Sequence, residues 1–254
     1  MPDPIECYSR QVISFSDAVQ QVKQHKRVLF KTLSLALIYA FYNVMTYWNL
    51  SIASPGLYRL LINVKVLFSA VGSILVFRRH ISPVQWLALF LLMAGCATAS
   101  YEGQVTLARY FTYVLIIVQG ALSSTAGIIS EHMFKTEECP FMLQNVFLYF
   151  WSAVVNLTFG YVQQVYAGES FTITQNFSLL VLAIITITAV AGFSTSLLLR
   201  YLSNLAKEFA HAVEVISTML AAWFVFGSPI TPQLIVGASL VVAALALYNR
   251  FKAK

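Results

Sequence analysis

The sequence predicts an all-α membrane protein that crosses the bilayer about eight times, and three observations support this fold class. Hydrophobic residues make up 59% of the 254 residues. Charged residues make up only 10%, against about 25% in an ordinary soluble domain, so polar groups cannot cover a water-exposed surface. The apolar residues also fall into separate stretches close to the roughly 20 residues that a helix needs to cross hydrocarbon.

Eight apolar stretches follow one another along the chain, and each is predicted to form one membrane helix. The third stretch is short and could begin as early as Ile81. In order, the predicted helices cover residues 29–50, 57–77, 84–99, 110–129, 141–162, 177–199, 209–226 and 234–248.

The basic residues gather on one side of this predicted bundle. A formal net charge of +6 would suggest a nucleic-acid partner for a soluble protein, but in a membrane protein the positions of the charges indicate topology. If the N-terminus is cytosolic, the opposite loops hold only Arg109, so we expect both termini in the cytosol and no nucleic-acid partner. The cytosolic side then carries Arg10, Lys23, Lys26, Arg27, Lys31, Arg78, Arg79, Lys135, Arg200, Lys207, Arg250, Lys252 and Lys254.

An internal echo indicates that the chain contains a duplication. Residues 77–83 (FRRHISP) are echoed by residues 226–232 (FGSPITP), 149 positions later (226 − 77), and each segment joins two apolar stretches. Many transporters consist of such repeats, with the substrate site between them near mid-membrane. The echo therefore points toward transport.

The offset also suggests how the chain is organised. Three predicted helices precede the midpoint and five follow it, so we expect a parent architecture of five plus five helices from which two N-terminal helices are absent. An odd number of helices per repeat would place the repeats in inverted orientation. We expect a cytosolic N-terminal segment at 1–27, a transmembrane domain at 28–249 with a partial first repeat at 28–101 and a second repeat at 108–249, and a basic cytosolic tail at 250–254.

Lys65 is the first candidate functional residue. It lies eight residues into its predicted helix, roughly 12 Å at 1.5 Å per residue and so near the bilayer midplane. A charge at this depth costs roughly 2.5–3.5 kcal/mol on insertion scales, so it needs a cavity, an ion pair or a substrate as its partner. A diphosphate or phosphodiester is suitable. The alternative is a permanent ion pair between Lys65 and a carboxylate. Glu214 is the candidate, because it follows Lys65 by 149 positions (214 − 65), the same offset that separates the two echoed segments.

No catalytic or metal site is indicated. His211 precedes Glu214 by one helical turn and could hydrogen-bond it or relay a proton, although a polar packing contact is the simpler interpretation. No further His or Cys falls near this depth, so we predict neither a metal ion nor a cofactor. The ionisable groups expected at depth form no recognisable nucleophile arrangement, so the sequence does not predict an enzyme.

Short motifs spread over the chain resemble those of the nucleotide-sugar transporters. The resemblance covers nearly everything after residue 14 and is closest to the branch that carries CMP-sialic acid and UDP-galactose. It implies an inverted-repeat bundle of the drug/metabolite transporter type. The motifs are residues 38–43 (IYAFYN), 57–65 (LYRLLINVK), 126–131 (AGIISE), 144–145 (QN), 195–196 (TS), 200–201 (RY) and 204–209 (NLAKEF).

The resemblance also implies which residues line or flank the substrate cavity. The matching positions are Tyr39, Asn43, Tyr58, Lys65, Ser123, Asn145, Tyr149, Thr195, Ser196 and Lys207. The chain departs from the family at several other positions: a family Gln-Asn-Asn reads Tyr42-Asn43-Val44, two glutamines are replaced by Arg59 and Asn63, and an arginine by Gln144. These departures leave the identity of the sugar open.

Two functions follow from the resemblance. The first is antiport, in the Golgi or endoplasmic reticulum membrane, of a cytosolic UDP-sugar or CMP-sugar for a lumenal nucleoside monophosphate. The alternative is a transport-incompetent, truncated homologue that binds other membrane proteins, as a homo-oligomer or together with full-length transporters. Helix surfaces left without their usual neighbours would favour the alternative.

Overall fold

The computed structural model describes residues 22–53, 58, 61–99, 110–166, 168, 178–226 and 231–250, and these residues are helical apart from short connections. A helix occupies each predicted apolar stretch: α2 (Lys26–Ile52), α4 (Lys65–Phe77), α5 (Pro83–Ala99), α6 (Tyr110–Thr136), α7 (Phe141–Tyr166), α8 (Leu179–Tyr201), α9 (Asn204–Phe226) and α10 (Pro232–Arg250). Helices α2, α6, α7, α8 and α10 are each long and apolar enough to cross a membrane, and α4 and α5 are shorter apolar helices. The prediction of an all-α, polytopic membrane protein is therefore confirmed.

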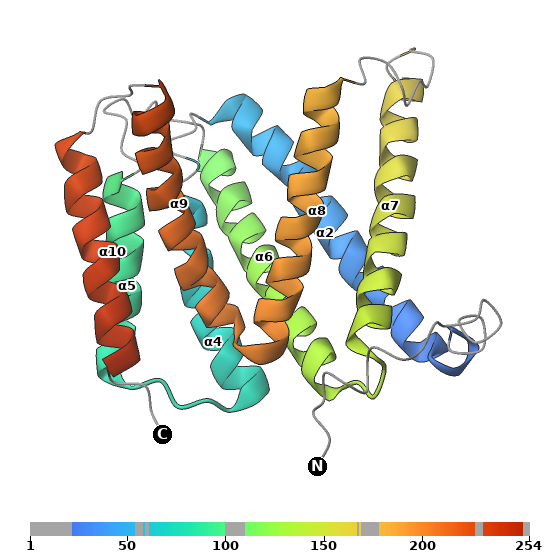
Figure 1. Ribbon diagram of the computed structural model, residues 1–254, viewed down its shortest axis with the longest axis horizontal. Coiled ribbons are helices and arrows are strands. Elements are labelled where there is room, and N and C mark those ends of the chain that lie inside the picture. The colour runs from blue at the N-terminus through green and yellow to red at the C-terminus, as the bar shows by residue number, and fades with distance from the viewer. Residues whose placement is uncertain are drawn as a thin grey trace.

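Successive helices run in opposite directions, so the connections alternate between the two ends of the molecule (Figure 1). The end that carries the start of α9 and the finish of α10 also holds the connection between α4 and α5 and the finish of α6. We call it the basic end, because its helix termini carry Lys26, Arg79, Lys135, Arg200 and Arg250. The segregation of basic residues that the sequence predicts is present in the fold. The predicted N-terminal segment and C-terminal tail lie largely outside the described residues.

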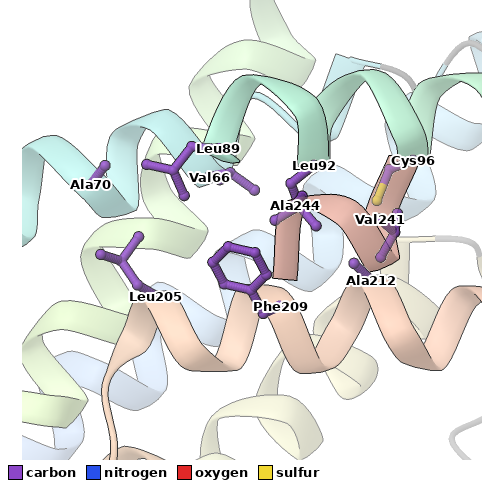
Figure 2. Packing of buried hydrophobic residues seen from close by; sticks show 10 residues of the cluster. All are labelled: Val66, Ala70, Leu89, Leu92, Cys96, Leu205, Phe209, Ala212, Val241 and Ala244. Carbon is purple, nitrogen blue, oxygen red and sulfur yellow. The ribbon is translucent and has the colours of Figure 1, made fainter. Parts of the chain in front are cut away.

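The helices pack as two groups, each around its own apolar cluster. Helices α4, α5, α9 and α10 enclose the cluster drawn in Figure 2, in which Phe209 of α9 points toward Leu89 and Leu92 of α5. Helices α2, α6, α7 and α8 enclose a second cluster that includes Leu35, Phe134, Phe141 and Leu199. Contacts of α6 with α4 and α9, and of α8 with α9, join the groups. The candidate site lies at this junction.

Helices α5 and α10, which follow the two echoed segments, pack closely against each other. Both begin with a hydroxyl residue and a proline: Ser82 accepts a hydrogen bond from the Gln85 amide while the Gln85 side chain accepts one from the Ser82 amide, and Thr231 caps the amide of Leu234. This is the capping expected where proline occupies the first helical position. The two helices run antiparallel (Figure 1), as an inverted repeat requires. The relation between complete repeats stays a prediction.

Small residues set the distance between α5 and α10. A Cβ atom at Gly95 would lie 2.9 Å from the carbonyl oxygen of Gly237, so only glycine permits this approach. Ala88 and Ala244 are also completely buried. Lipid chains are as apolar as leucine, so membrane helices associate through close packing of such small residues.

Three predicted helix boundaries differ from the structure by five residues or more. The predicted helix at 110–129 continues to Thr136 as α6. The predicted helix at 57–77 is interrupted by a turn at Asn63 and Val64, where hydrogen bonds span three residues, and α4 begins only at Lys65. The predicted helix at 209–226 begins five residues earlier, at Asn204. Hydropathy missed this first turn and a half because Lys207 and Glu208 interrupt the apolar run.

Glu131 of α6 explains why α9 begins where it does. Its carboxylate is completely buried and accepts three hydrogen bonds: from Arg79 Nη2 at 2.7 Å, from Lys135 Nζ at 2.8 Å and from the backbone amide of Asn204 at 2.8 Å. The last contact places a negative charge at the start of α9, where the helix dipole favours it. One side chain thus connects α6 to the α4–α5 connection and to the start of α9.

Asn204 extends this connection. Its side-chain amide donates to Ser69 Oγ at 2.9 Å, and Ser69 lies 2.9 Å from Ser124 Oγ. Gly127 of α6 makes room for Asn204, since a Cβ atom there would lie 2.0 Å from Asn204 Oδ1. Close approach of α6 and α9 therefore depends on a glycine at this position.

We expect Gly127→Ala to destabilise the protein by about 1–3 kcal/mol, because the added methyl group displaces Asn204 and weakens its contacts with Ser69 and Glu131. The matched control is Gly160→Ala in α7, where a Cβ atom would meet nothing within 4 Å; this change should be neutral or stabilise the helix by up to about 1 kcal/mol. Thermal unfolding of the purified protein in detergent measures both. Equal stability of the two variants would contradict the role given to Gly127.

Arg78 ends α4 in the left-handed conformation, with φ 51° and ψ 34°, and its amide donates to Ser73 O. Non-glycine residues pay roughly 1–2 kcal/mol for this backbone region, and the residue equivalent to Arg78 in the echoed segment is Gly227. We expect Arg78→Gly to raise stability by about 1 kcal/mol in the same unfolding measurement. Arg78→Ala is the control, because it removes the same charge and keeps the Cβ atom. A gain shared by both variants would show that charge, not backbone conformation, is responsible.

Candidate functional site

A cluster of charged side chains lies between α4 and α9, at the junction of the two helix groups. Lys65 Nζ is 3.1 Å from one carboxylate oxygen of Glu208, and Lys207 Nζ is 3.5 Å from the other. The side chains of Glu208 and Lys65 are only 1% and 10% exposed, and that of Lys207 is 20% exposed. Two lysines around one carboxylate leave the cluster with a net charge of +1 when all three groups are ionised.

The fold brings this cluster together from two places where a helix begins. Lys65 is the first residue of α4, directly after the turn at Asn63 and Val64. Lys207 and Glu208 lie in the first and second turns of α9, whose start is set by the Glu131 contact with Asn204. A charge buried at this depth is favourable only with a partner, and Glu208 supplies that partner for Lys65.

The ion pair of Lys65 with Glu214 that the repeat offset predicts is not formed. Lys65 pairs with Glu208, six residues earlier. Six residues at 3.6 per turn separate two side chains by about 120° around a helix, so Glu214 lies on another face of α9 than Glu208, and its side chain is 71% exposed. Glu214 instead lies 3.2 Å from His211 Nδ1, which confirms the contact that the spacing of these two residues predicts.

Beside the charged cluster lies a cavity of about 260 Å³. It brings together three residues of the predicted site, Lys65, Lys207 and Thr195, from α4, α9 and α8. Its lining also includes Ser194, Leu198, Ala210, His211 and Glu214. Both carboxylate oxygens of Glu208 are buried and accept no hydrogen bond of good geometry among the described residues, so the two lysines hold this carboxylate through their charge.

Four more residues of the predicted site lie on α2, α7 and α8. Tyr39 OH is 3.2 Å from Ser130 Oγ, and Tyr149 directs its hydroxyl at Gly192, where a Cβ atom would be 2.8 Å away. Ser196 is buried and donates to Gly192 O. Asn145 is buried with its side-chain oxygen unpaired among the described residues.

The three remaining residues of the predicted site have different surroundings. Asn43 is exposed on α2, and Ser123 is half-buried on α6. Tyr58 is buried and accepts a hydrogen bond from Gln119 Nε2 at 3.0 Å. The structure therefore places Lys65, Thr195 and Lys207 around one cavity, and the other seven residues of the predicted site are not among the residues that line it.

Gln119 connects Tyr58 to α2. Its amide nitrogen also lies within hydrogen-bond distance of Thr46 Oγ1, at 2.5 Å, and its oxygen accepts from Asn49 Nδ2 at 2.7 Å. Gln119 and Asn49 are both completely buried. A buried amide in an apolar region needs such partners, so Tyr58 belongs to a network that holds α2 against α6.

The two buried carboxylates that organise the site, Glu131 and Glu208, are not among the residues that the sequence predicts for it. Both lie within motifs that carry the family resemblance, AGIISE and NLAKEF, but no role was assigned to them. The signal that could have found them is physical: an acidic residue next to an apolar run is costly and therefore normally has a functional or structural partner. Among the described residues, no group of three His, Cys, Asp or Glu side chains could hold a metal ion.

Comparisons with known proteins agree with the resemblance. A family model described as nucleotide-sugar transporter matches residues 8–249. The chain is 26% identical to the UDP-galactose transporter senju of Drosophila melanogaster, over 91% of this chain and 70% of that protein. It is 30% identical to CMP-sialic acid transporter 4 of Oryza sativa subsp. indica, over 83% of this chain and 54% of that protein.

The chain is also 25% identical to CMP-sialic acid transporter 2 of the same rice subspecies, over 84% of this chain and 61% of that protein. It thus spans between about half and 70% of the length of these relatives. A solved crystal structure superposes on the fold with a TM-score of 0.67, over 94% of this chain and 93% of its own, at 11% identity. At that identity the likeness shows the fold alone.

We expect Glu208→Gln to destabilise the protein by about 3 kcal/mol, because it leaves Lys65 buried without a counter-charge. Glu214→Gln is the matched control, and its effect should stay below about 1 kcal/mol because Glu214 is exposed. Replacing both Lys65 and Glu208 by leucine should recover part of the loss, since no unpaired charge remains between them. Unfolding in detergent measures all three variants, and a larger loss for Glu214→Gln than for Glu208→Gln would reverse the assignment of the ion pair.

Proposed function

Because the chain belongs to the nucleotide-sugar transporter family, we propose that it carries a UDP-sugar or CMP-sugar across an internal membrane in exchange for a nucleoside monophosphate. The observation that carries this proposal is the pair of lysines, Lys65 and Lys207, that line one cavity at the junction of the helix groups and share the buried carboxylate of Glu208. A phosphate group is the anion that such a site suits, since a charge in an apolar region needs an opposite charge as its partner.

In this mechanism Lys65 and Lys207 neutralise the phosphate, and Glu208 holds the two lysines when no substrate is bound. A phosphate that enters the cavity competes with Glu208 for their positive charge, so binding and release require no permanent rearrangement of the cluster. The carboxylate oxygens of Glu208, released from the two lysines, can then accept hydrogen bonds from hydroxyl groups of the ribose or the sugar. Thr195 lines the same cavity and supplies a hydroxyl group.

The base and the sugar would occupy the adjoining region between α2, α7 and α8. Tyr39 and Tyr149 supply aromatic rings there, and stacking of a base on a ring contributes about 1–3 kcal/mol. Asn145 contributes an unpaired buried oxygen, a suitable acceptor for an amino group of a base. We also assign Ser196 to this region, and we assign Asn43, Tyr58 and Ser123 to it on the family match alone.

Alternating access would proceed by movement of one helix group relative to the other. The Glu131 contacts close the basic end, where Lys135 also donates to the carbonyl oxygen of Leu202 in the α8–α9 connection. Toward the opposite end, residues 182–191 of α8 are all exposed, so that half of α8 buries little of its surface. These two observations support a conformation that is closed at the basic end and open at the other.

The same proposal includes the orientation of the protein in the membrane and the organelle in which it lies. Positively charged loops stay on the cytosolic side of most membrane proteins, so the basic end would face the cytosol and the opposite end the lumen of the Golgi or the endoplasmic reticulum. The described conformation would then be accessible from the lumen. The transported molecule would be released there and replaced by the nucleoside monophosphate.

The test is uptake of labelled CMP-sugars and UDP-sugars into proteoliposomes that are preloaded with CMP or UMP. We expect saturable exchange of at least one substrate, reduced about tenfold or more by Lys207→Gln, because loss of one charge-assisted contact costs about 1.5–3 kcal/mol. Lys207 is the first choice because its side chain is partly exposed and its loss leaves the Lys65–Glu208 pair intact. Lys26→Gln, at an exposed position on α2, is the charge-matched control.

Exchange that persists at the normal rate in Lys207→Gln would overturn the role given to this lysine. No exchange by folded protein with any substrate in the panel would overturn antiport itself. In that case the interaction role becomes the better interpretation, and association with full-length transporters would be the property to measure.

A further inference from the structure

A second and larger cavity, of about 840 Å³, lies at the basic end, and of its lining residues only Ala210 also lines the cavity of the candidate site. It is formed by the α4–α5 connection, the α8–α9 connection, the first three turns of α9 and the last turns of α10. These elements belong mainly to the helix group of α4, α5, α9 and α10. The cavity thus opens beside the bundle near the membrane surface, and the proposed transport mechanism does not use it.

The lining of this cavity is polar at one side and apolar at the other. Arg79, His80, Tyr201, Ser203 and Asn249 form its polar part, at the ends of the helices. The apolar part follows α9 from Leu205 to Val213, a rise of about 12 Å along the helix axis, with Phe209 between them. An amphiphilic molecule with its head at the basic end and its chain along α9 has the matching distribution of polarity.

The charge of the lining favours an anionic head group. Arg79 and His80 are its ionisable basic residues, and none of its described lining residues is acidic. Arg79 shares Glu131 with Lys135, so one carboxylate balances two cations and a net positive charge remains. Arg78 and Arg250, both exposed, adjoin lining residues in the sequence.

We propose that this cavity binds one anionic phospholipid from the membrane leaflet at the basic end. The phosphate lies against Arg79 and His80, and an acyl chain lies along α9 past Ala206 and Phe209. Basic pockets between membrane helices are suited to such head groups, and Arg79 presents a planar fork of donors that matches phosphate oxygens. A soluble anion would gain nothing from the apolar wall, so the observations favour the lipid.

The lipid would also affect the hydrogen bonds of Glu131, because Arg79 contacts both Glu131 and the lipid phosphate. Its bound phosphate adds a second anionic partner to the guanidinium that closes the basic end. The proposal concerns only binding and holds whether or not the protein exchanges nucleotides, so it can be tested without a transport assay.

The test is native mass spectrometry of the purified full chain, titrated with phosphatidylinositol and with phosphatidylcholine of the same acyl chains. We expect one phosphatidylinositol to bind at least about tenfold more tightly than phosphatidylcholine and to raise the unfolding temperature. Arg79→Gln should lose this preference, whereas Lys26→Gln should keep it. Equal binding of the two lipids would overturn the proposal.

Arg79→Gln also removes a contact of Glu131 and could unfold the protein, so a second variant is needed. Ala206→Trp fills the apolar part of the cavity and leaves the contact between Arg79 and Glu131 in place; we expect it to abolish the lipid preference. Ala183→Trp, at an exposed position on α8, is its control and should have no effect. Retention of phosphatidylinositol by Ala206→Trp overturns the proposal.

Two further arms separate the lipid from other occupants. Inorganic phosphate should not displace the bound phosphatidylinositol, and displacement at equal concentration would show a simple anion site. Deletion of residues 251–254 should leave the preference unchanged. A preference that appears only after this deletion would assign the cavity to the C-terminal tail and overturn the proposal.

Discussion

The arrangement of the other helices depends on the hydrogen bonds that the Glu131 carboxylate accepts. It is completely buried, and its donors come from the α4–α5 connection, from α6 itself and from the first amide of α9. A buried charge is costly unless it is paired and hydrogen-bonded, so these segments cannot separate without exposing it or leaving it unpaired. This constraint determines how the two helix groups meet at the basic end.

The charged cluster of the candidate site follows from the same constraint. Since Glu131 accepts the amide of Asn204, α9 begins there, and Lys207 and Glu208 lie in its first two turns. Lys65 reaches Glu208 because α4 begins at this lysine, next to α9. Structural stability and the proposed substrate site therefore share a side chain: Glu208, which pairs with Lys65 across α4 and α9, also lies beside the two lysines proposed to bind phosphate.

Much of the fold could be predicted because the bilayer imposes strong requirements on sequence. Helices must be long and apolar, and their backbone groups must be satisfied internally, so hydropathy alone located the helical stretches. That Lys65 would need a partner inside the bundle could be inferred for the same reason, and Lys65 is buried. The ion partner of Lys65 could not, because repeat symmetry indicates which positions are equivalent but not which side of a helix faces a neighbour. A rotation of about 120° separates Glu208 from Glu214.

The sequence by itself determined that this chain is a helical membrane protein, that its basic residues lie at one end, and that a lysine lies where a charge needs a partner. These features depend on composition and on the spacing of residues, and both can be read from the sequence without knowing which helices are neighbours. Only the tertiary structure decided that Glu208 is that partner, that Glu131 joins three segments, and that Tyr58 belongs to the Gln119 network. Such contacts depend on which face of a helix is turned toward its neighbour and on how closely two helices approach at a glycine. Packing between residues far apart in the sequence determines both.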